Sequence, residues 1–169
     1  EIFASETFTR RNTTIIYQDT SGIEKSGDAI LLMEDHLVDR IMIDYKNYNS
    51  SIPSDETSKL VRDLRAQNMK FGILISYRSK ICKRRYIDYD IIDGTLIVFI
   101  AATGMNISMI EMAIQYLCKL HECNVLSTSQ KVAELVVKGS MKKITDIYER
   151  LYELNRLHSQ HINTMKENL

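Results

Sequence analysis

Three residues of the chain have types and spacing suited to chemistry on a phosphate. Asp44 and Lys46 lie two residues apart in the run Arg40–Tyr48, and in a strand such residues point to the same face. Asp28 opens a second apolar run, and antiparallel pairing of the two runs brings it close to that face. Carboxylates held together need a cation between them. We therefore expect a Mg²⁺ or Mn²⁺ site that activates a water against phosphate.

These residues need a sheet to position them, and the sequence pattern supplies one. Runs rich in β-branched and aromatic residues predict strands at 13–18, 27–33, 37–45, 71–76, 86–92 and 95–101, the last two around the turn Asp93-Gly94. Helical spacing predicts a helix with Ser54 or Asp55 as its N-cap that ends near Ala66. Residues 1–12 are expected to form a short helix or an ill-defined start.

The run Phe71–Ser76 is almost continuously apolar, which is typical of a strand buried on both faces. Strand, helix and strand then form a right-handed crossover with parallel strands. A basic cluster follows the carboxyl end of this strand, where open α/β sheets place their binding crevice. It consists of Arg78, Lys80, Lys83, Arg84 and Arg85. We expect it to bind nucleic-acid phosphates, with Tyr48 and Tyr77 beside the backbone. A solvated turn is the alternative.

After about residue 105 the apolar spacing becomes helical. Helices are expected from Ser108 to about Leu120, over 128–138 and over 141–167. The last has a partial heptad seam interrupted by His158 and His161, which allows a homodimer. The expected organisation is a sheet with its crossover helix in residues 1–105, then a helical extension in 106–169 that packs on or continues the same domain.

Composition excludes several classes. The 169 residues have zero formal net charge, which argues against a histone-like basic binder. No apolar run is long enough for a membrane helix, and no signal-peptide pattern occurs. Three cysteines without a C-x-x-C pair favour a reducing intracellular compartment, cytoplasm or nucleus. Zinc bound by Cys118, His121 and Cys123 would lack an evident fourth ligand. Because the first residue is Glu1, we expect a fragment or a processed chain.

The motifs Gly27-Asp28-Ala29-Ile30 and Ile43-Asp44-Tyr45-Lys46-Asn47-Tyr48, followed by a helix and Phe71–Ser76, resemble the PD-(D/E)XK nuclease superfamily. The resemblance covers roughly residues 13–101. It is closest in style to Mrr-type, Holliday-junction-resolvase-like and RmuC-like nucleases and to related domains of large DNA viruses. It implies an α/β, restriction-endonuclease-like fold: a mixed central sheet with a crossover helix, followed here by C-terminal helices. It also implies a Mg²⁺- or Mn²⁺-dependent endonuclease acting on DNA.

Carried over residue by residue, the resemblance makes Asp28 the first acid, Asp44 the second and Lys46 the lysine that handles the attacking water. The main-chain carbonyl of Tyr45 would complete the metal coordination. The chain departs from the pattern, since Gly27 replaces proline before the first acid and Asp44 stands where Glu is more usual.

The family's helical glutamate ahead of the first strand has Glu1 or Glu6 as candidates here, and Glu6 is the further acid we single out. Glu56 and Lys59 are the local candidates for a contribution from the helix that follows. For these residues a surface position is the alternative reading.

Other readings of the same residues stay open. Asp28 could be a turn residue, and Asp44 with Lys46 a surface ion pair worth less than about 1 kcal/mol. The domain could also keep the fold as a catalytically inactive DNA-binding or assembly module. A serine hydrolase and a nucleotide-binding fold are disfavoured, because the chain has no G-x-S-x-G, G-x-G-x-x-G or P-loop motif.

Overall fold

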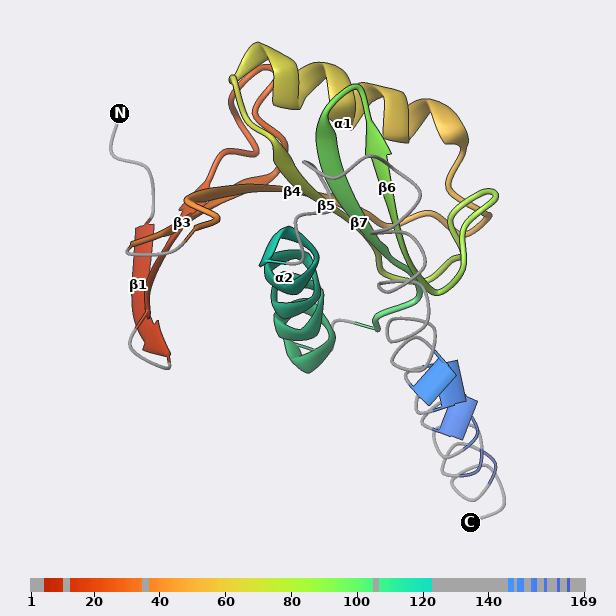
Figure 1. Cartoon of the computed structure of the whole chain (residues 1–169). Helices are drawn as coiled ribbons and strands as arrows, with labels where there is room; N and C mark the ends of the chain where they lie inside the picture. The colour runs from red at the N-terminus through yellow and green to blue at the C-terminus, as the bar shows by residue number, and fades with distance from the viewer. Residues whose placement is uncertain are drawn as a thin grey trace.

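The chain folds into a mixed sheet with one helix on each face, as seen in a computed structural model (Figure 1). The structure describes residues 5–10, 13–34, 37–104 and 107–122, with scattered positions between 146 and 164. Its strands are β1 (Ser5–Arg10), β2 (Thr13–Asp19), β3 (Ala29–Met33), β4 (Arg40–Lys46), β5 (Phe71–Ser76), β6 (Ile87–Ile92) and β7 (Thr95–Ile100). Within the four continuous ranges the helices are α1 (Ser54–Ala66) and α2 (Ile107–Glu122). The N-cap of α1 is Pro53, one residue before the expected Ser54 or Asp55, and no side chain caps it.

The sheet has seven strands in the order β1-β2-β3-β4-β5-β7-β6. From β1 to β4 each strand pairs antiparallel with the next, and β3 meets β4 with Ala29 opposite Ile43. β5 then lies parallel to β4, so that α1 is the crossover between them, and β7 lies parallel to β5. The predicted mixed α/β architecture with a parallel crossover is confirmed, and β4, β5 and β7 end at the same edge of the sheet.

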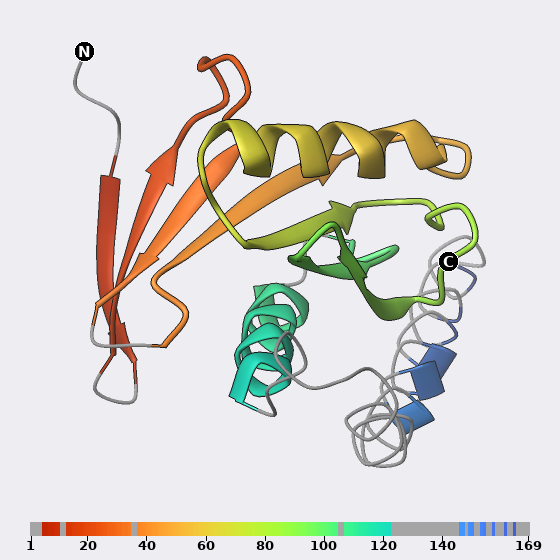
Figure 2. The ribbon, with the colours of Figure 1, turned by 45° about the horizontal axis from the view of Figure 1, so that its top comes forward.

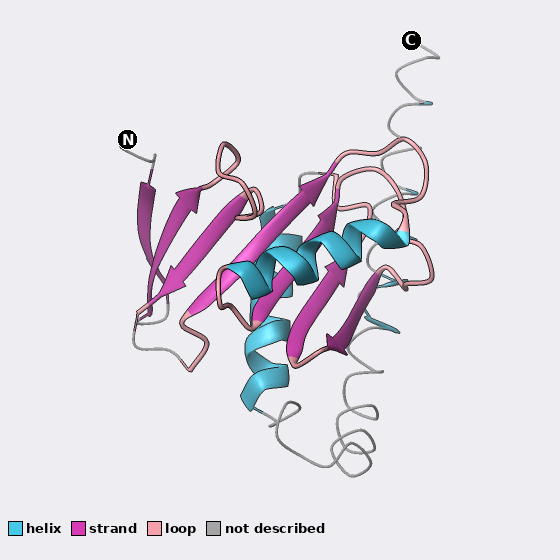
Figure 3. Ribbon diagram, turned by 90° about the horizontal axis from the view of Figure 1, so that it is seen from above, coloured by secondary structure: helices cyan, strands magenta, loops and turns pink. Residues whose placement is uncertain are grey.

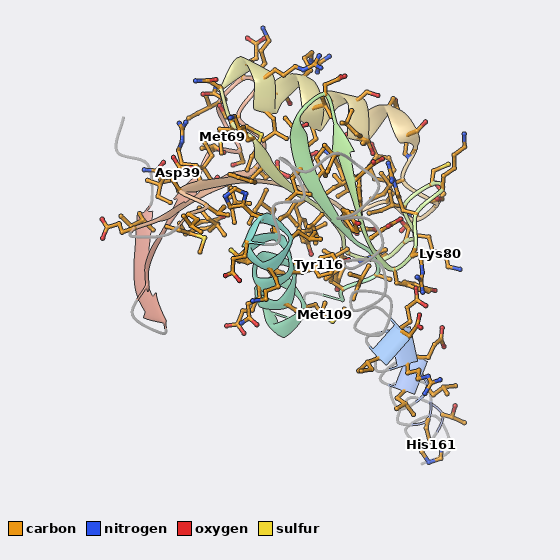
Figure 4. The ribbon with its side chains drawn as sticks, viewed as in Figure 1. Asp39, Met69, Lys80, Met109, Tyr116 and His161 are labelled. Atoms are coloured by element: carbon orange, nitrogen blue, oxygen red, sulfur yellow. The ribbon has the colours of Figure 1, made fainter. Side chains whose placement is uncertain are left out.

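The two helices bury opposite faces of the central strands (Figures 2 and 3). α1 packs Leu60, Val61 and Leu64 against a cluster that includes Met42 of β4. On the other face α2 packs mainly against β7 and β5, in a cluster that also includes Ile43, and the Tyr116 ring lies 6.1 Å from that of Tyr89 (Figure 4). β5 is buried at every position because it is covered on both sides, as its continuous apolar run predicts.

The turn between β6 and β7 also follows its sequence. Asp93 and Gly94 have φ of +52° and +78°, and they join antiparallel strands in which Ile92 pairs with Thr95. Positive φ at both central residues is the geometry of a type I′ hairpin turn, which Asp-Gly favours.

The amino-terminal expectation is wrong for residues 5–10. These residues form β1, an edge strand paired with β2 from Ser5↔Gln18 to Arg10↔Thr13. The segment Thr7-Phe8-Thr9 carries two β-branched residues and one aromatic residue, which favour a strand. The neighbouring antiparallel β2 supplies hydrogen-bond partners along one side of the segment, whereas a helix of six residues would leave most of its backbone groups unpaired.

Beyond residue 105 the first expected helix is present as α2, and it shares a buried cluster with the sheet. The helices expected at 128–138 and 141–167 lie outside the described residues, apart from scattered helical positions such as Asp146 and Glu149. Those two helices stay predictions. In the part of the chain that the structure describes, no helix is long and apolar enough to span a bilayer.

Candidate active site

Alternation along β4 sets the direction of the first two site residues. Met42 packs in the cluster under α1, whereas Ile43 and Tyr45 pack on the α2 side. Because side chains alternate along a strand, Asp44 and Lys46 share the α1 face with Met42, and Tyr45 points the other way. Asp44 is opposite Leu74 and Lys46 opposite Ser76 on β5. Both therefore lie where the three parallel strands end.

Asp28 is placed by the loop between β2 and β3. Its backbone N–H donates to the carbonyl of Ile43 at 2.9 Å, and its Oδ2 accepts the backbone N–H of Tyr45 at 2.6 Å. The register that pairs Ala29 with Ile43 puts Asp28 opposite Asp44. The Thr20 hydroxyl ties the loop together by donating to the Ser26 carbonyl at 2.9 Å.

Lys46 joins two carboxylates from different elements. Its Nζ lies 2.9 Å from Oδ1 of Asp44 and 3.2 Å from Oε2 of Glu56, which stands in the first turn of α1. The side chains of Asp44, Lys46 and Glu56 are 4%, 11% and 16% exposed. The hydroxyl of Tyr48 donates to Oε1 of Glu56 at 2.6 Å. The result is a chain of four polar groups from the buried end of β4 to the surface.

Charge and burial shift the pKa values of the four groups that these polar contacts join. Burial raises the pKa of Asp44; the Lys46 ammonium acts against that rise, and repulsion from Asp28 adds to it. Burial alone would lower the pKa of Lys46, but the Asp44 carboxylate, followed by Glu56, raises it well above its usual range. Lys46 is therefore charged at neutral pH, and its ammonium favours the ionised form of the buried Asp44 carboxyl.

Glu56 is one of the two helix residues that the sequence offers as candidates, and it reaches Lys46 at 3.2 Å, whereas Lys59, the other, is exposed. Burial would raise its pKa, but the hydrogen bond from Tyr48 and the Lys46 ammonium outweigh burial and lower it. The pKa of Tyr48 is raised by the same hydrogen bond. α1 begins only a short loop after β4, so its amino end lies near the edge where β4 ends. A carboxylate in its first turn can therefore reach Lys46.

The donor set at this edge fits a hard divalent cation in part. Oδ2 of Asp44 is buried and has no hydrogen-bond partner among the described residues, and an unpaired buried carboxylate oxygen is costly. Asp28 offers a carboxylate beside it. The Tyr45 carbonyl points to the β3 side because its N–H does. Oxygen ligands of these kinds suit Mg²⁺ or Mn²⁺.

Few carboxylates lie at this edge, and each of them already takes part in a hydrogen bond or an ion pair. Within the described ranges no group of three or more His, Cys, Asp or Glu side chains is placed to hold a metal ion. One oxygen of Asp28 accepts a hydrogen bond from the backbone of β4, and Lys46 lies between Asp44 and Glu56. A cation here would therefore rest on Asp28 and Asp44 with the Tyr45 carbonyl, and solvent would complete its coordination.

The basic cluster lies on the loop between β5 and β6, beside the site. The loop is held to the chain before α1 by a bridge between Ile52 and Ile81, and the N–H of Tyr77 donates to the Lys46 carbonyl at 2.8 Å. Arg78 stacks on the Tyr77 ring at 5.2 Å. Lys80 projects from this loop (Figure 4) with its ammonium 5.1 Å from the Tyr86 ring. Lys83 is exposed with a left-handed φ of +57°.

The last two arginines of the cluster are engaged within the chain. Arg84 pairs with Asp90 at 2.6 Å and lies over the Phe99 ring. Arg85 forms a forked pair with Glu149, with both N–O distances 3.0 Å, and contacts Asp146 at 2.9 Å. Their charges are largely compensated, so Arg78, Lys80 and Lys83 are the better candidates for phosphate contacts.

The remaining predicted residues divide between the rim of the site, where Tyr48 and Tyr77 lie, and positions apart from it. Glu6 is on β1, and β2 and β3 separate its backbone from β4. Tyr48 and Tyr77 contact Glu56 and Arg78, respectively. In the zinc alternative, Cys118 is buried, burial raises its pKa to about 11, and Cys123 lies outside the described residues.

Comparisons of the chain with models of protein families, with curated proteins and with solved structures gave no significant match. The functional argument therefore rests on the geometry of the edge where β4, β5 and β7 end.

Proposed function

We propose that this chain is a metal-dependent nuclease that hydrolyses phosphodiester bonds in DNA, with Asp28, Asp44 and Lys46 as its reactive groups. One observation carries the proposal. Asp44 is buried, its Oδ1 contacts Lys46 at 2.9 Å, and its Oδ2 has no partner in the described part of the chain, while Asp28 lies opposite, immediately before β3. A buried, half-satisfied carboxylate beside a second carboxylate and a fixed ammonium suits a cation and a phosphate together.

Different residues of the protein would bind the metal ion and orient the attacking water. Asp28 and Asp44 would hold Mg²⁺ or Mn²⁺, with the main-chain carbonyl of Tyr45 as a third ligand. When bound, such an ion supplies a polarised phosphoryl oxygen and a water of lowered pKa. Lys46 orients the attacking water and stabilises the negative charge that develops on the phosphate. No covalent enzyme intermediate is required.

The architecture supports the same proposal. A mixed sheet with a crossover helix between β4 and β5 is what the resemblance to PD-(D/E)XK nucleases implies, and we propose the restriction-endonuclease-like fold on that basis. Arg78, Lys80 and Lys83 would hold the DNA backbone beside the site. A homodimer through the carboxyl-terminal seam remains part of the proposal, because duplex cleavage often uses two sites.

The proposal is tested by cleavage of plasmid and single-stranded DNA with Mg²⁺ or Mn²⁺. Asp44→Asn and Lys46→Met keep side-chain size and remove one reactive group each. Loss of the metal ligand or of the charge-stabilising ammonium should lower the rate at least about 10²-fold. Circular dichroism checks that the variants remain folded. Cleavage by either variant at the wild-type rate would contradict the proposal.

A second candidate is a catalytically inactive DNA-binding or assembly module on the same fold. It is favoured by the position of Lys46, whose ammonium already compensates both Asp44 and Glu56, and by the lack of a three-carboxylate group in the described ranges. Calorimetry separates the two functions: DNA binding without any Mn²⁺ binding would favour the module.

A further inference from the structure

The polar chain at the end of β4 continues past the three proposed reactive residues. From the interior outward it runs through Asp44, Lys46, Glu56 and Tyr48, with contacts of 2.9, 3.2 and 2.6 Å. These residues come from β4, from α1 and from the loop that joins them. Its two outer residues, Glu56 and Tyr48, belong neither to the proposed metal site nor to the basic loop. Their role therefore needs a separate explanation.

We propose that Glu56 and Tyr48 are positioning residues that hold Lys46 over Asp44, a role that rests on the proposed function of Lys46. A lysine ammonium is a point charge on a stem of four rotatable carbons, and a single partner leaves it free to swing. Asp44 and Glu56 reach the ammonium from two different elements. Two anchors on separate elements fix its position in a way that one cannot.

Tyr48 completes the arrangement by fixing Glu56 itself. Each Glu56 oxygen has its own contact: Oε1 accepts from the Tyr48 hydroxyl, and Oε2 forms an ion pair with the Lys46 ammonium at 3.2 Å, without a hydrogen bond among the described residues. A carboxylate held at both oxygens cannot rotate without losing a contact. Tyr48 is exposed at the rim of the site. Three successive contacts, through Glu56 and Lys46, therefore link this surface residue to the buried Asp44.

A general helix-stabilising role is the simpler explanation for Glu56, since acidic residues in a first turn favour the helix macrodipole. Asp55 occupies that turn too, carries the same charge and is exposed. Among the described residues the ion-pair partners of Lys46 are Asp44 and Glu56, not Asp55. Asp55→Asn is therefore a matched control. It removes one first-turn charge from α1 and leaves the chain of contacts to Lys46 intact.

The experiment compares Glu56→Gln, Tyr48→Phe and Asp55→Asn by two measurements. The first is kcat and KM for Mn²⁺-dependent DNA cleavage. The second is the ¹⁵Nζ–¹H correlation of the Lys46 ammonium in metal-free protein, which is visible when the group is held and protected from exchange. Loss of a group that orients a reactive residue typically costs about 10- to 100-fold in activity. We expect Glu56→Gln to lower kcat by that factor with KM for DNA unchanged, and to lose the correlation.

Tyr48→Phe removes one hydroxyl from an exposed side chain, so it keeps the test valid if Glu56→Gln unfolds. It should weaken the correlation and lower kcat by a smaller factor, while Asp55→Asn retains both. A Lys46 correlation and a kcat that persist in Glu56→Gln and in Tyr48→Phe would overturn the positioning role. If the protein cleaves no DNA and yet loses the correlation only in the two variants, the proposed function fails and the positioning contact stands.

Discussion

Asp28 makes a hydrogen bond that a purely catalytic carboxylate would not need. Its Oδ2 accepts the backbone N–H of Tyr45 at 2.6 Å, which takes the place of a strand partner just where β3 begins. It also lies opposite Asp44 and raises the pKa of that carboxyl by repulsion. The Asp28 side chain therefore has a structural role, the hydrogen bond to Tyr45, and an electrostatic role beside Asp44. Different substitutions can separate the two roles.

Asp28→Asn is expected to keep the fold and weaken metal binding. The amide oxygen can still accept the Tyr45 N–H, whereas the charge that would attract Mn²⁺ is gone. The affinity for Mn²⁺, measured by calorimetry, should fall at least about 10-fold, which corresponds to 1.4 kcal/mol. Asp28→Ala removes the acceptor as well, and an unpaired N–H costs about 1–3 kcal/mol in urea unfolding. Equal Mn²⁺ affinity in wild type and Asp28→Asn would show that Asp28 is structural only.

At the level of elements, the loop between β2 and β3 decides where Asp28 lies. Gly27 has a φ of +65°, and a Cβ built on it would lie 2.8 Å from the backbone oxygen of Ile43. Glycine is required here for two separate reasons, the left-handed backbone and the close approach to β4. This contact fixes the distance between the two strands that carry the carboxylates.

Gly27→Ala should therefore damage both the fold and the site. The backbone conformation alone costs about 1–3 kcal/mol for a residue with a side chain, and the close contact with Ile43 adds to that cost. Gly22 in the same loop has open space around it and lacks a positive φ, so Gly22→Ala should stay within about 0.5 kcal/mol of wild type. Urea unfolding of the two variants makes the comparison. Equal stabilities would mean that the loop can move away from β4 at little cost.

At the scale of the whole molecule, the sequence predicts most of the sheet. The continuous apolar run of β5, the Asp93-Gly94 turn and the crossover before β5 each have a strong local pattern, and each is present. β1 was missed because six residues with one apolar side chain give little periodicity. Its pairing with β2 is a tertiary effect that a local pattern does not contain.

The candidate site could be predicted only in part for a similar reason. Asp44 and Lys46 share a face because a strand alternates, and that follows from their spacing alone. Glu56 reaches Lys46 through the packing of α1 on the sheet, and Arg85 is compensated by Glu149, which lies far along the chain. Contacts between distant segments depend on how the elements pack, so no spacing rule reveals them.

The compensation of Arg84 and Arg85 changes the expected footprint of DNA on the molecule. Each phosphate contact contributes about 0.9 to the slope of log K against log salt concentration. Arg78→Gln and Lys80→Gln should each lower that slope by about this amount, measured by fluorescence anisotropy at several salt concentrations. Arg84→Gln and Arg85→Gln should change it less, because those guanidiniums pair with Asp90 and with Glu149.

Arg62 provides the control for charge. It is exposed on α1, away from the loop that carries Arg78, so Arg62→Gln makes the same charge change without removing a phosphate contact and should leave the slope unaltered. A slope that falls equally in all variants would indicate attraction by overall charge. A slope that falls only in Arg84→Gln and Arg85→Gln would mean that DNA displaces their carboxylate partners, and the binding face would then extend toward Asp146 and Glu149.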